Sequence, residues 1–305
     1  MKKLNIFLIL IGTLIIQDLY GYALPAVNLG FTNILDGGPV RPKPGFYIYE
    51  YFQYYYSNKF LDSTGHLLDG VPSPTYNSYA IVNQFIYQTK ENVLLKAKGG
   101  IDLVLPIVLS STISKNILNI TNSGAGFGDF DLGIYLQWDT IYRKGRPFFA
   151  NRLNFNASFP TGQFLSNKSI NPGAGFFWID PYWAATFYFT EKASVSWRLH
   201  YLWCAKNPTN QVSPGTAIHC NFSFEYEVIN NFYLALVGYV LQQLNNTKKD
   251  NVVVPNSKER VLGIGPGALY MNSEDLMFFG YLYFEMDVRN RPQGISLILR
   301  LLKHF

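Results

Sequence analysis

The chain has few charges and, after its first residues, no long apolar run, and each shortage excludes a class of protein. Charged residues make up 15% of its 305 residues, and the net charge of +5 comes without blocks of Lys or Arg. A nucleic-acid-binding protein needs such basic clusters, so no nucleic acid is expected as a partner. No apolar run beyond the N-terminus reaches the roughly 18 residues of a spanning helix. Yet 48% of the residues are hydrophobic and 17% aromatic, and this surface must enter a core or face lipid.

Cysteine is also scarce, and the 2 cysteines are not expected to form a disulfide. If Ala205 pairs with Thr216, Cys204 lies about 10 Å from Cys220 along the strands. The alternation of side chains also puts the two thiols on opposite faces of the sheet. A bridge would therefore require a slip in strand register.

The N-terminus has the parts of a secretory signal peptide. Lys2 and Lys3 form a basic start, residues 4–16 form an apolar run, and Ala23 is a suitable small residue before a cleavage site. The run is short for a spanning helix, which favours cleavage over an uncleaved anchor. Residues 1–23 are therefore predicted to direct export and to be removed.

The rest of the chain alternates apolar and polar residues with the period of two that is typical of β-strands. Its last residues, "GISLILRLLKHF", place Leu297, Leu299 and Leu301 on one face and Arg300 and His304 on the other. A soluble sandwich also alternates. However, the apolar faces are wide and uniform, and aromatic residues recur near strand ends, which favours strands between lipid and a water-filled lumen.

These segments predict an all-β fold, an antiparallel up-and-down transmembrane β-barrel of about 12 strands, within 2 of that number, over residues 46–305. The connections alternate in length almost throughout, as long external loops and short periplasmic turns do in outer-membrane barrels. The long ones are 58–78, 107–126, 161–177 and 245–257, and the short ones are 90–92, 191–192, 229–231 and 272–275.

A barrel in a bilayer has to close, so the last strand is predicted to pair with the first. Phe305 then lies at the periplasmic rim as an aromatic anchor, and Lys303 extends to the headgroups. A terminal aromatic residue on such a strand resembles the signal that the barrel-assembly machinery of Gram-negative bacteria reads. The expected location is the bacterial outer membrane, and the expected partners are its lipid, that machinery and a small-molecule solute.

The polar faces of the strands carry a mixed set of charges that are predicted to line the lumen. They select or contact a solute, or they fill a narrow barrel with ion pairs and hydrogen bonds, and the pattern allows both. The candidates are Lys96, Lys98, Asp102, Asp129, Asp131, Arg152, Arg198, His200, His219, Asn221, Glu225, Glu227, Glu285 and Arg300.

Two histidines fall close together on adjacent strands. The register used above sets His200 opposite Asn221 and about 7–8 Å from His219 on the diagonal, with Arg198 opposite Ser223. Metal binding is an alternative for this pair, but no fixed ligand spacing supports it, so neither a metal site nor a cofactor is predicted.

Several long motifs resemble one family, grouped under the MetA-pathway of phenol degradation and described as outer-membrane transporters. They include "NLGFTNILDGGPV", "INPGAGFFWIDPYWAATFYFT", "AIHCNFSFEYEV" and "FEMDVRNRPQG", and the resemblance runs from Asn28 to Phe305. The chain departs from the family at Cys204, where Asn is usual, and at Leu276–Met277, where a His–Leu pair is usual. The resemblance implies an outer-membrane channel for small solutes, including phenolic or other aromatic and hydrophobic compounds, and supplies no catalytic residues.

Two other functions stay open, and one segment needs its own account. A structural or adhesive barrel without transport would act through its loops. A membrane-embedded hydrolase needs a serine beside a histidine base, directed toward lipid, whereas the wall histidines point inward, so the chain is not expected to be an enzyme. Residues 24–45 are too long for a simple lead-in to the first strand and are predicted to fold into the barrel as a plug.

Overall fold

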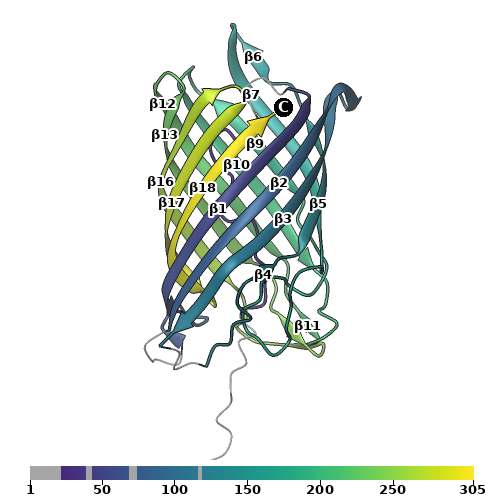
Figure 1. The fold of residues 1–305 in the computed structure, drawn as a ribbon, viewed down its shortest axis with the longest axis vertical. Helices are drawn as coiled ribbons and strands as arrows, with labels where there is room; N and C mark the ends of the chain where they lie inside the picture. The colour runs from purple at the N-terminus through teal and green to yellow at the C-terminus, as the bar shows by residue number, and fades with distance from the viewer. Residues whose placement is uncertain (1–21, 39–42, 69–73, 116–118) are drawn as a thin grey trace, which may run out of the picture.

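The structure is a computed structural model, and it describes residues 22–38, 43–68, 74–115 and 119–305. Nearly all of the predicted signal peptide lies outside the described residues. Within those ranges, no helix has both the length and the apolar character needed to cross a membrane. The described chain forms β-strands that wrap into one closed barrel (Figure 1).

Twelve long strands form the barrel wall, in agreement with the strand number predicted from the sequence. Each wall strand is antiparallel to its neighbours, and β18 pairs with β1, so that the sheet closes on itself. The wall strands are β1 (Gly45–Phe60), β2 (Thr75–Leu94), β3 (Ala97–Ser114), β5 (Phe130–Gln137), β7 (Arg146–Phe159), β9 (Tyr182–Tyr188), β10 (Ala193–Cys204), β12 (Ala217–Ile229), β13 (Phe232–Gln243), β16 (Arg260–Ser273), β17 (Leu276–Arg289) and β18 (Pro292–His304).

Six short strands of the described chain lie at the two ends of the barrel. At the end where the long connections gather, β11, β14 and β15 form a separate small sheet (Figure 1). The end that holds the C-terminus has the shorter turns and the projecting β6. The short strands are β4 (Gly126–Phe127), β6 (Ile141–Arg143), β8 (Trp178–Ile179), β11 (Val212–Ser213), β14 (Lys248–Lys249) and β15 (Val252–Val253).

The alternation of the sequence becomes an apolar outer surface and a polar interior. In β7, Leu153 and Phe155 on the outside are 48% and 50% exposed, whereas Arg152 and Asn154 on the inside are 8% and 2% exposed. A soluble protein arranges these residue types in the opposite way. A barrel whose outer wall contacts lipid has this arrangement.

The strand bounds differ most from the prediction in the hairpin of β2 and β3. The sequence predicts strands at 79–89 and 94–106, but pairing extends to Thr75 opposite Ser114, where polar residues fall on both faces and the alternation is lost. Leu95 and Lys96 both have positive φ and form the turn of the hairpin. Lys96 is therefore exposed beyond the strand, and its predicted inward position was wrong.

Strands β10 and β12 pair two residues away from the predicted register. His200 lies opposite His219, not Asn221, and Arg198 lies opposite Asn221. The faces are unchanged because a shift of two residues preserves the alternation. The pairing of β10 with β12 ends at Leu202 opposite Ala217, and on its other edge, the one that faces β9, β10 continues to β8, where Cys204 lies opposite Trp178.

Candidate functional site

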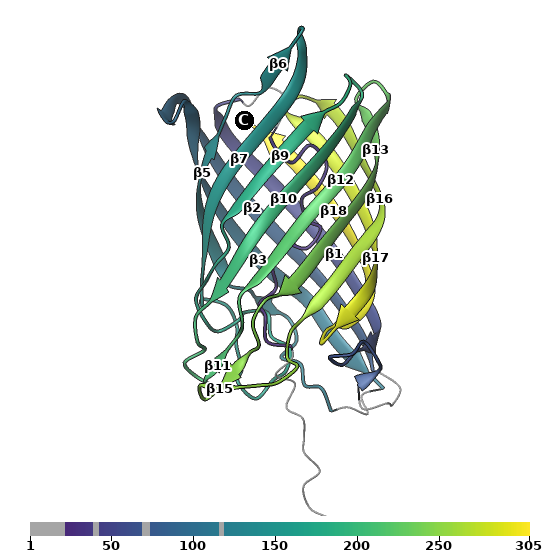
Figure 2. The same ribbon diagram turned by 180° about the vertical axis from the view of Figure 1, so that it is seen from behind.

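Residues 22–38, which precede β1, run through the inside of the barrel (Figure 2). The segment has no regular secondary structure, so its backbone groups need partners from the wall. Ile34 is 1% exposed and Asp36 is 6% exposed. Inward side chains of β9 and β12 accept backbone N–H groups of the segment: Asn221 from Gly30 at 2.9 Å, Glu225 from Leu35 at 3.1 Å and Thr186 from Gly37 at 2.9 Å.

A buried ion pair fixes this segment to the wall. The Arg198 guanidinium donates from Nε and Nη2 to the two oxygens of Asp36, both at 2.7 Å. The side chains are 7% and 3% exposed. Two parallel charge-assisted hydrogen bonds in a dry site fix both the position and the orientation of Asp36.

A cavity of about 620 Å³ lies beside the segment. Its lining includes Asn231 and Glu274 of the short turns, which places it in the half of the barrel nearer the C-terminus. Apolar side chains, aromatic rings and three arginines share the lining. They include Ile34, Ile86, Leu269, Met277, Leu302, Tyr49, Tyr51, Phe279, Arg152, Arg198 and Arg300.

Arg300 is the arginine of this cavity that has buried guanidinium nitrogens without a hydrogen-bond partner among the described residues. Its guanidinium carbon lies 4.7 Å from the centre of the Tyr49 ring, 5.5 Å from that of Tyr51 and 4.4 Å from that of Phe279. The residue is 9% exposed, and its Nε and Nη1 are buried without a hydrogen-bond partner. Ring faces attract the cation but do not accept these N–H groups as an anion would.

The other two arginines are better satisfied. Arg198 is paired with Asp36 as described. Arg152 donates from Nε to Gln137 at 2.8 Å and lies over the Tyr135 ring at 4.3 Å. Arg300 differs from both because its Nε and Nη1 are buried without a partner, whereas Nε of each of the other two has an acceptor.

Most of the remaining predicted lumen residues make hydrogen bonds within the wall. Asp102 accepts from Gln84 Nε2 at 2.9 Å. Glu225 accepts from Ser196 at 2.5 Å, and Glu285 accepts from Tyr239 at 2.8 Å. These hydrogen-bonded acids stabilise the packed interior. Asp131 differs from them, because its Oδ1 is buried without a hydrogen-bond partner. His200 and His219 meet across β10 and β12, where both contact Asp180.

Three more of the predicted residues lie at the ends of the barrel and are not among the residues that line the cavity. Asp129 accepts the backbone N–H groups of Gly162 and Ala174 at 2.8 and 2.7 Å and so fixes both ends of the connection between β7 and β8 beside the start of β5. Lys98 forms an ion pair with Asp139 at 2.5 Å. Glu227 accepts the backbone N–H of Asn231 at 2.9 Å in a turn.

The end of the chain is held by a group that we call the rim cluster, Lys43, Asp275 and His304. Lys43 Nζ and His304 Nδ1 lie 2.8 and 2.9 Å from the same Asp275 oxygen. The hydrogen bonds from Lys43 and then His304 lower the pKa of Asp275 to about 2. The same contact with Asp275, followed by that with Glu274, raises the pKa of Lys43. Phe305, which follows, donates its backbone N–H to Phe46 O at 2.9 Å and is 66% exposed.

Sequence reasoning missed the partners of several inward residues. Asp36 and Asp180 are each a single acid in segments without period-two alternation, "NILDGGPV" and "WIDPYW". The available signal was an isolated charge among apolar residues, which seldom enters a core unpaired. Phe279, which lines the cavity, was not among the predicted lumen residues. Apolar residues occupy both faces of its segment, "LMFFGY", so the alternation does not show which of them point inward.

Comparison with known proteins assigns the chain to a family. The family model described as "Putative MetA-pathway of phenol degradation" matches residues 57–301, most of the chain. The chain belongs to this family. The resemblance seen in the sequence motifs is thereby confirmed. We found no match to the chain among curated protein sequences.

Two solved structures illustrate the similarity of the chain to known proteins. An outer membrane channel from Pseudomonas putida F1 matches with a TM-score of 0.75 and 16% identity, over 92% of this chain and all 100% of that one. The translocator domain of the autotransporter NalP from Neisseria meningitidis matches with a TM-score of 0.48 and 10% identity, over 88% of this chain and 91% of that one. The first match establishes that the two chains share a fold.

Proposed function

We propose that this member of the family is a bacterial outer-membrane channel for small aromatic solutes, and above all for aromatic carboxylates and phenolates. The observation that carries the proposal is the buried Arg300 guanidinium, which lies between aromatic rings in the cavity with Nε and Nη1 unpartnered. A carboxylate matches the guanidinium fork with two parallel hydrogen bonds. The ring of the same solute packs against Tyr49 or Phe279.

An anion is favoured over a neutral ring because buried donors without acceptors cost free energy. A solute that supplies those acceptors recovers that cost on binding. The apolar part of the lining, which includes Ile86 and Leu269, excludes water around the ring. Acetate has the charge but not the ring, so it gains only part of this binding free energy.

The comparisons support the proposal without deciding it. The family is named for phenol degradation, and the Pseudomonas putida protein of the same fold is an outer membrane channel. The apolar outer wall, the predicted signal peptide and the terminal Phe305 support export to the outer membrane. Lipid and the barrel-assembly machinery are the corresponding partners.

The same proposal gives residues 24–45 the role of a plug. Thr32, Ile34 and Asp36 form one side of the cavity, so a solute has to pass them to cross the barrel. The Arg198–Asp36 ion pair would hold the plug in place between transport events. An enzymatic role is not proposed, because a histidine base needs a serine hydroxyl on the ring nitrogen that its orienting acid leaves free, and among the described residues His200 Nε2 and His219 Nδ1 have no hydrogen-bond partner.

The test is the current through the refolded protein in a planar bilayer, recorded with added benzoate or acetate. We expect benzoate to block the current at concentrations where acetate does not. Arg300→Gln should weaken the benzoate block about tenfold or more, because a hydrogen bond to a charged group contributes about 1.5–3 kcal/mol. Arg289→Gln is the matched control, since it removes the same charge from an exposed strand end.

Equal block by benzoate and acetate, or an unchanged benzoate block in Arg300→Gln, would show that the cavity does not select aromatic anions. A folded barrel without any conductance would favour a structural barrel. The heat-dependent mobility of each variant on an electrophoresis gel shows whether the barrel has folded.

A further inference from the structure

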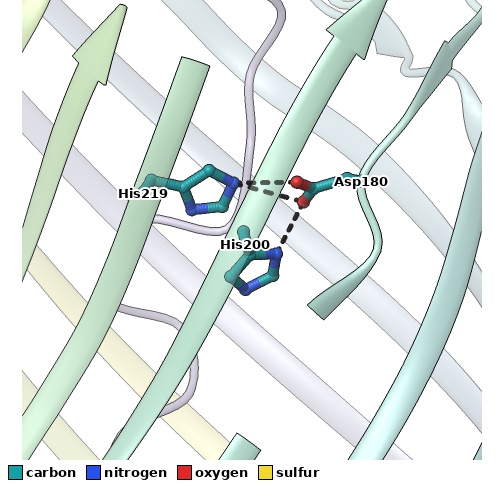
Figure 3. A group of neighbouring side chains, drawn as sticks. All are labelled: Asp180, His200 and His219. Atoms are coloured by element: carbon teal, nitrogen blue, oxygen red, sulfur yellow. Dashed lines mark hydrogen bonds and ion pairs between the residues drawn. The ribbon is translucent and has the colours of Figure 1, made fainter. Parts of the chain in front are cut away.

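Asp180, His200 and His219 form a compact group on the inner wall (Figure 3). His200 Nδ1 lies 2.8 Å from Asp180 Oδ2, and His219 Nε2 lies 3.0 Å from Asp180 Oδ1. The two rings lie opposite each other on β10 and β12. They stack with their centres 4.0 Å apart and an angle of 17° between their planes. Their exposed fractions are 2% and 1%, and that of Asp180 is 3%.

The hydrogen bonds of the group satisfy only half of the ring nitrogens. An ionised carboxylate only accepts hydrogen bonds, so the ring nitrogen that faces Asp180 carries the proton in each histidine. In a neutral ring the other nitrogen then carries a lone pair and can only accept a hydrogen bond. These atoms, His200 Nε2 and His219 Nδ1, are buried and have no hydrogen-bond partner. Buried polar atoms of folded proteins are rarely left in this state.

We propose that Asp180, His200 and His219 bind a divalent transition-metal ion of the zinc class. One carboxylate oxygen and two imidazole nitrogens lie within 4.8 Å of one another, and they are ligand types that zinc prefers. Tetrahedral bonds of about 2.0–2.2 Å set the ligand atoms about 3.4 Å apart, so each histidine nitrogen has to move roughly half an ångström from its Asp180 oxygen, and the stacked rings have to tilt so that both lone pairs point at the ion. Three protein ligands leave a fourth position for water or a solute, as in zinc sites that are not purely structural.

Binding requires a change of tautomer but no loss of protons from the rings. The ligating nitrogens, Nδ1 of His200 and Nε2 of His219, give up their protons and present lone pairs to the metal. The protons reside instead on His200 Nε2 and His219 Nδ1, which then donate to water or to a carbonyl brought in as the rings tilt, and Asp180 exchanges two hydrogen bonds for a metal bond. Calcium and magnesium are disfavoured, because both prefer oxygen ligands.

The surrounding fold holds the ligands in place. Asp180 and Pro181 form the break between β8 and β9, which directs the carboxylate to the inner face of β10. Leu202 and Ala217 pair one step further along the same inner face and are fully buried. On the other side, the charge of Arg198 is compensated by Asp36. Arg198 therefore adds no uncompensated positive charge beside a cation at the histidines, and the low dielectric strengthens the attraction of that cation to Asp180.

The proposal is independent of the solute and is tested on the full-length barrel in detergent. Added cobalt(II) reports its ligands through visible absorption, and metal analysis after dialysis gives the stoichiometry. We expect one cobalt per chain, displaced by zinc but not by calcium or magnesium. His200→Gln, His219→Gln and Asp180→Asn should each weaken binding at least about tenfold, since even outer-shell partners contribute that much. His66→Gln is the matched control, because His66 is an exposed histidine of a long connection.

No bound cobalt in the folded wild-type barrel would overturn the proposal, as would unchanged binding in both histidine variants. X-ray absorption at the zinc edge provides a test that needs no variant. The expected spectrum contains the scattering of two imidazoles and only nitrogen or oxygen in the first shell. Sulfur in that shell would assign the metal to Cys204 or Cys220 and would also overturn the proposal.

Discussion

Arg152, Arg198 and Arg300 lie on the same inner surface, but their partners differ and decide what each can do. Arg198 is neutralised by Asp36, and Arg152 donates to Gln137, whereas Arg300 contacts ring faces. The sequence predicts the inward direction of all three, because the period of two fixes the face of each residue. It does not predict their partners, because Asp36 belongs to a segment without periodicity.

Replacing Asp36 tests how firmly the N-terminal segment is held. Asp36→Ala leaves the Arg198 guanidinium buried without its carboxylate, and breaking such a pair costs about 3–5 kcal/mol. We expect the segment to loosen inside an intact barrel, so that limited proteolysis cleaves within residues 22–38 much faster than in the wild type.

The double variant Asp36→Ala with Arg198→Met is the control for that experiment. It removes both charges, so no uncompensated cation remains, and the cleavage rate should return toward that of the wild type. Equal cleavage of the single and double variants would mean that contacts other than this ion pair hold the segment.

At the scale of strands, the alternation predicts faces well and registers poorly. A shift of one residue would turn every side chain of β10 to the wrong face, and the sequence excludes it. A shift of two residues leaves every face correct, so the pattern could not show that His200 pairs with His219. The predicted register failed because it assumed pairing up to Ala205 and Thr216, whereas β10 and β12 pair only as far as Leu202 and Ala217.

The rim cluster of Lys43, Asp275 and His304 joins the end of β18 to the turn between β16 and β17, and it predicts how the stability of this contact depends on pH. The pKa of Asp275 is lowered from 3.8 to about 2, so its contribution to stability is complete above pH 3.8 and is lost as the pH falls through about 2. The raised pKa of Lys43 means that this contact weakens again only when the pH rises above 10.5. We expect wild type to unfold at a higher temperature than Asp275→Asn at pH 5, and this difference to shrink at pH 2.

Thermal unfolding of both proteins, followed by tryptophan fluorescence, measures this difference. His66→Gln serves as a control for the general effect of acid. A difference between wild type and Asp275→Asn that stays constant from pH 5 to pH 2 would mean that the Asp275 carboxylate does not stabilise the rim.

On the scale of the whole molecule, the barrel wall separates lipid from a filled interior. The strand number, the closed sheet and the apolar outer surface follow from the sequence, because a lipid-facing wall imposes strict alternation. The path of residues 22–38 does not follow, because polar contacts of an irregular segment depend on residues far away in the sequence. A second cavity of about 500 Å³, lined partly by Tyr22 to Ala26, lies among the long connections on the other side of the segment.

Deleting residues 24–38 tests whether the segment separates the two cavities. The deletion keeps Lys43 and the rim cluster, so the barrel should still fold. We expect a several-fold higher single-channel conductance and a lower unfolding temperature, because the wall loses the ion pair of Arg198 and the hydrogen bonds to Gly30 and Leu35. Conductance equal to that of the wild type would show that the segment does not limit flow.

The pairing of β1 with β18 also sets an order of events during assembly. Tyr47 lies opposite His304, so the seam joins the two ends of the barrel and can form only after every other wall strand is available. Residues 22–38 precede β1 and end up enclosed. They must therefore be inside the curving sheet before the seam forms, or thread through an end of the finished barrel afterwards. The first route uses the gap between β1 and β18, which is open only until these strands pair. The segment then has to enter the barrel before β18 joins β1.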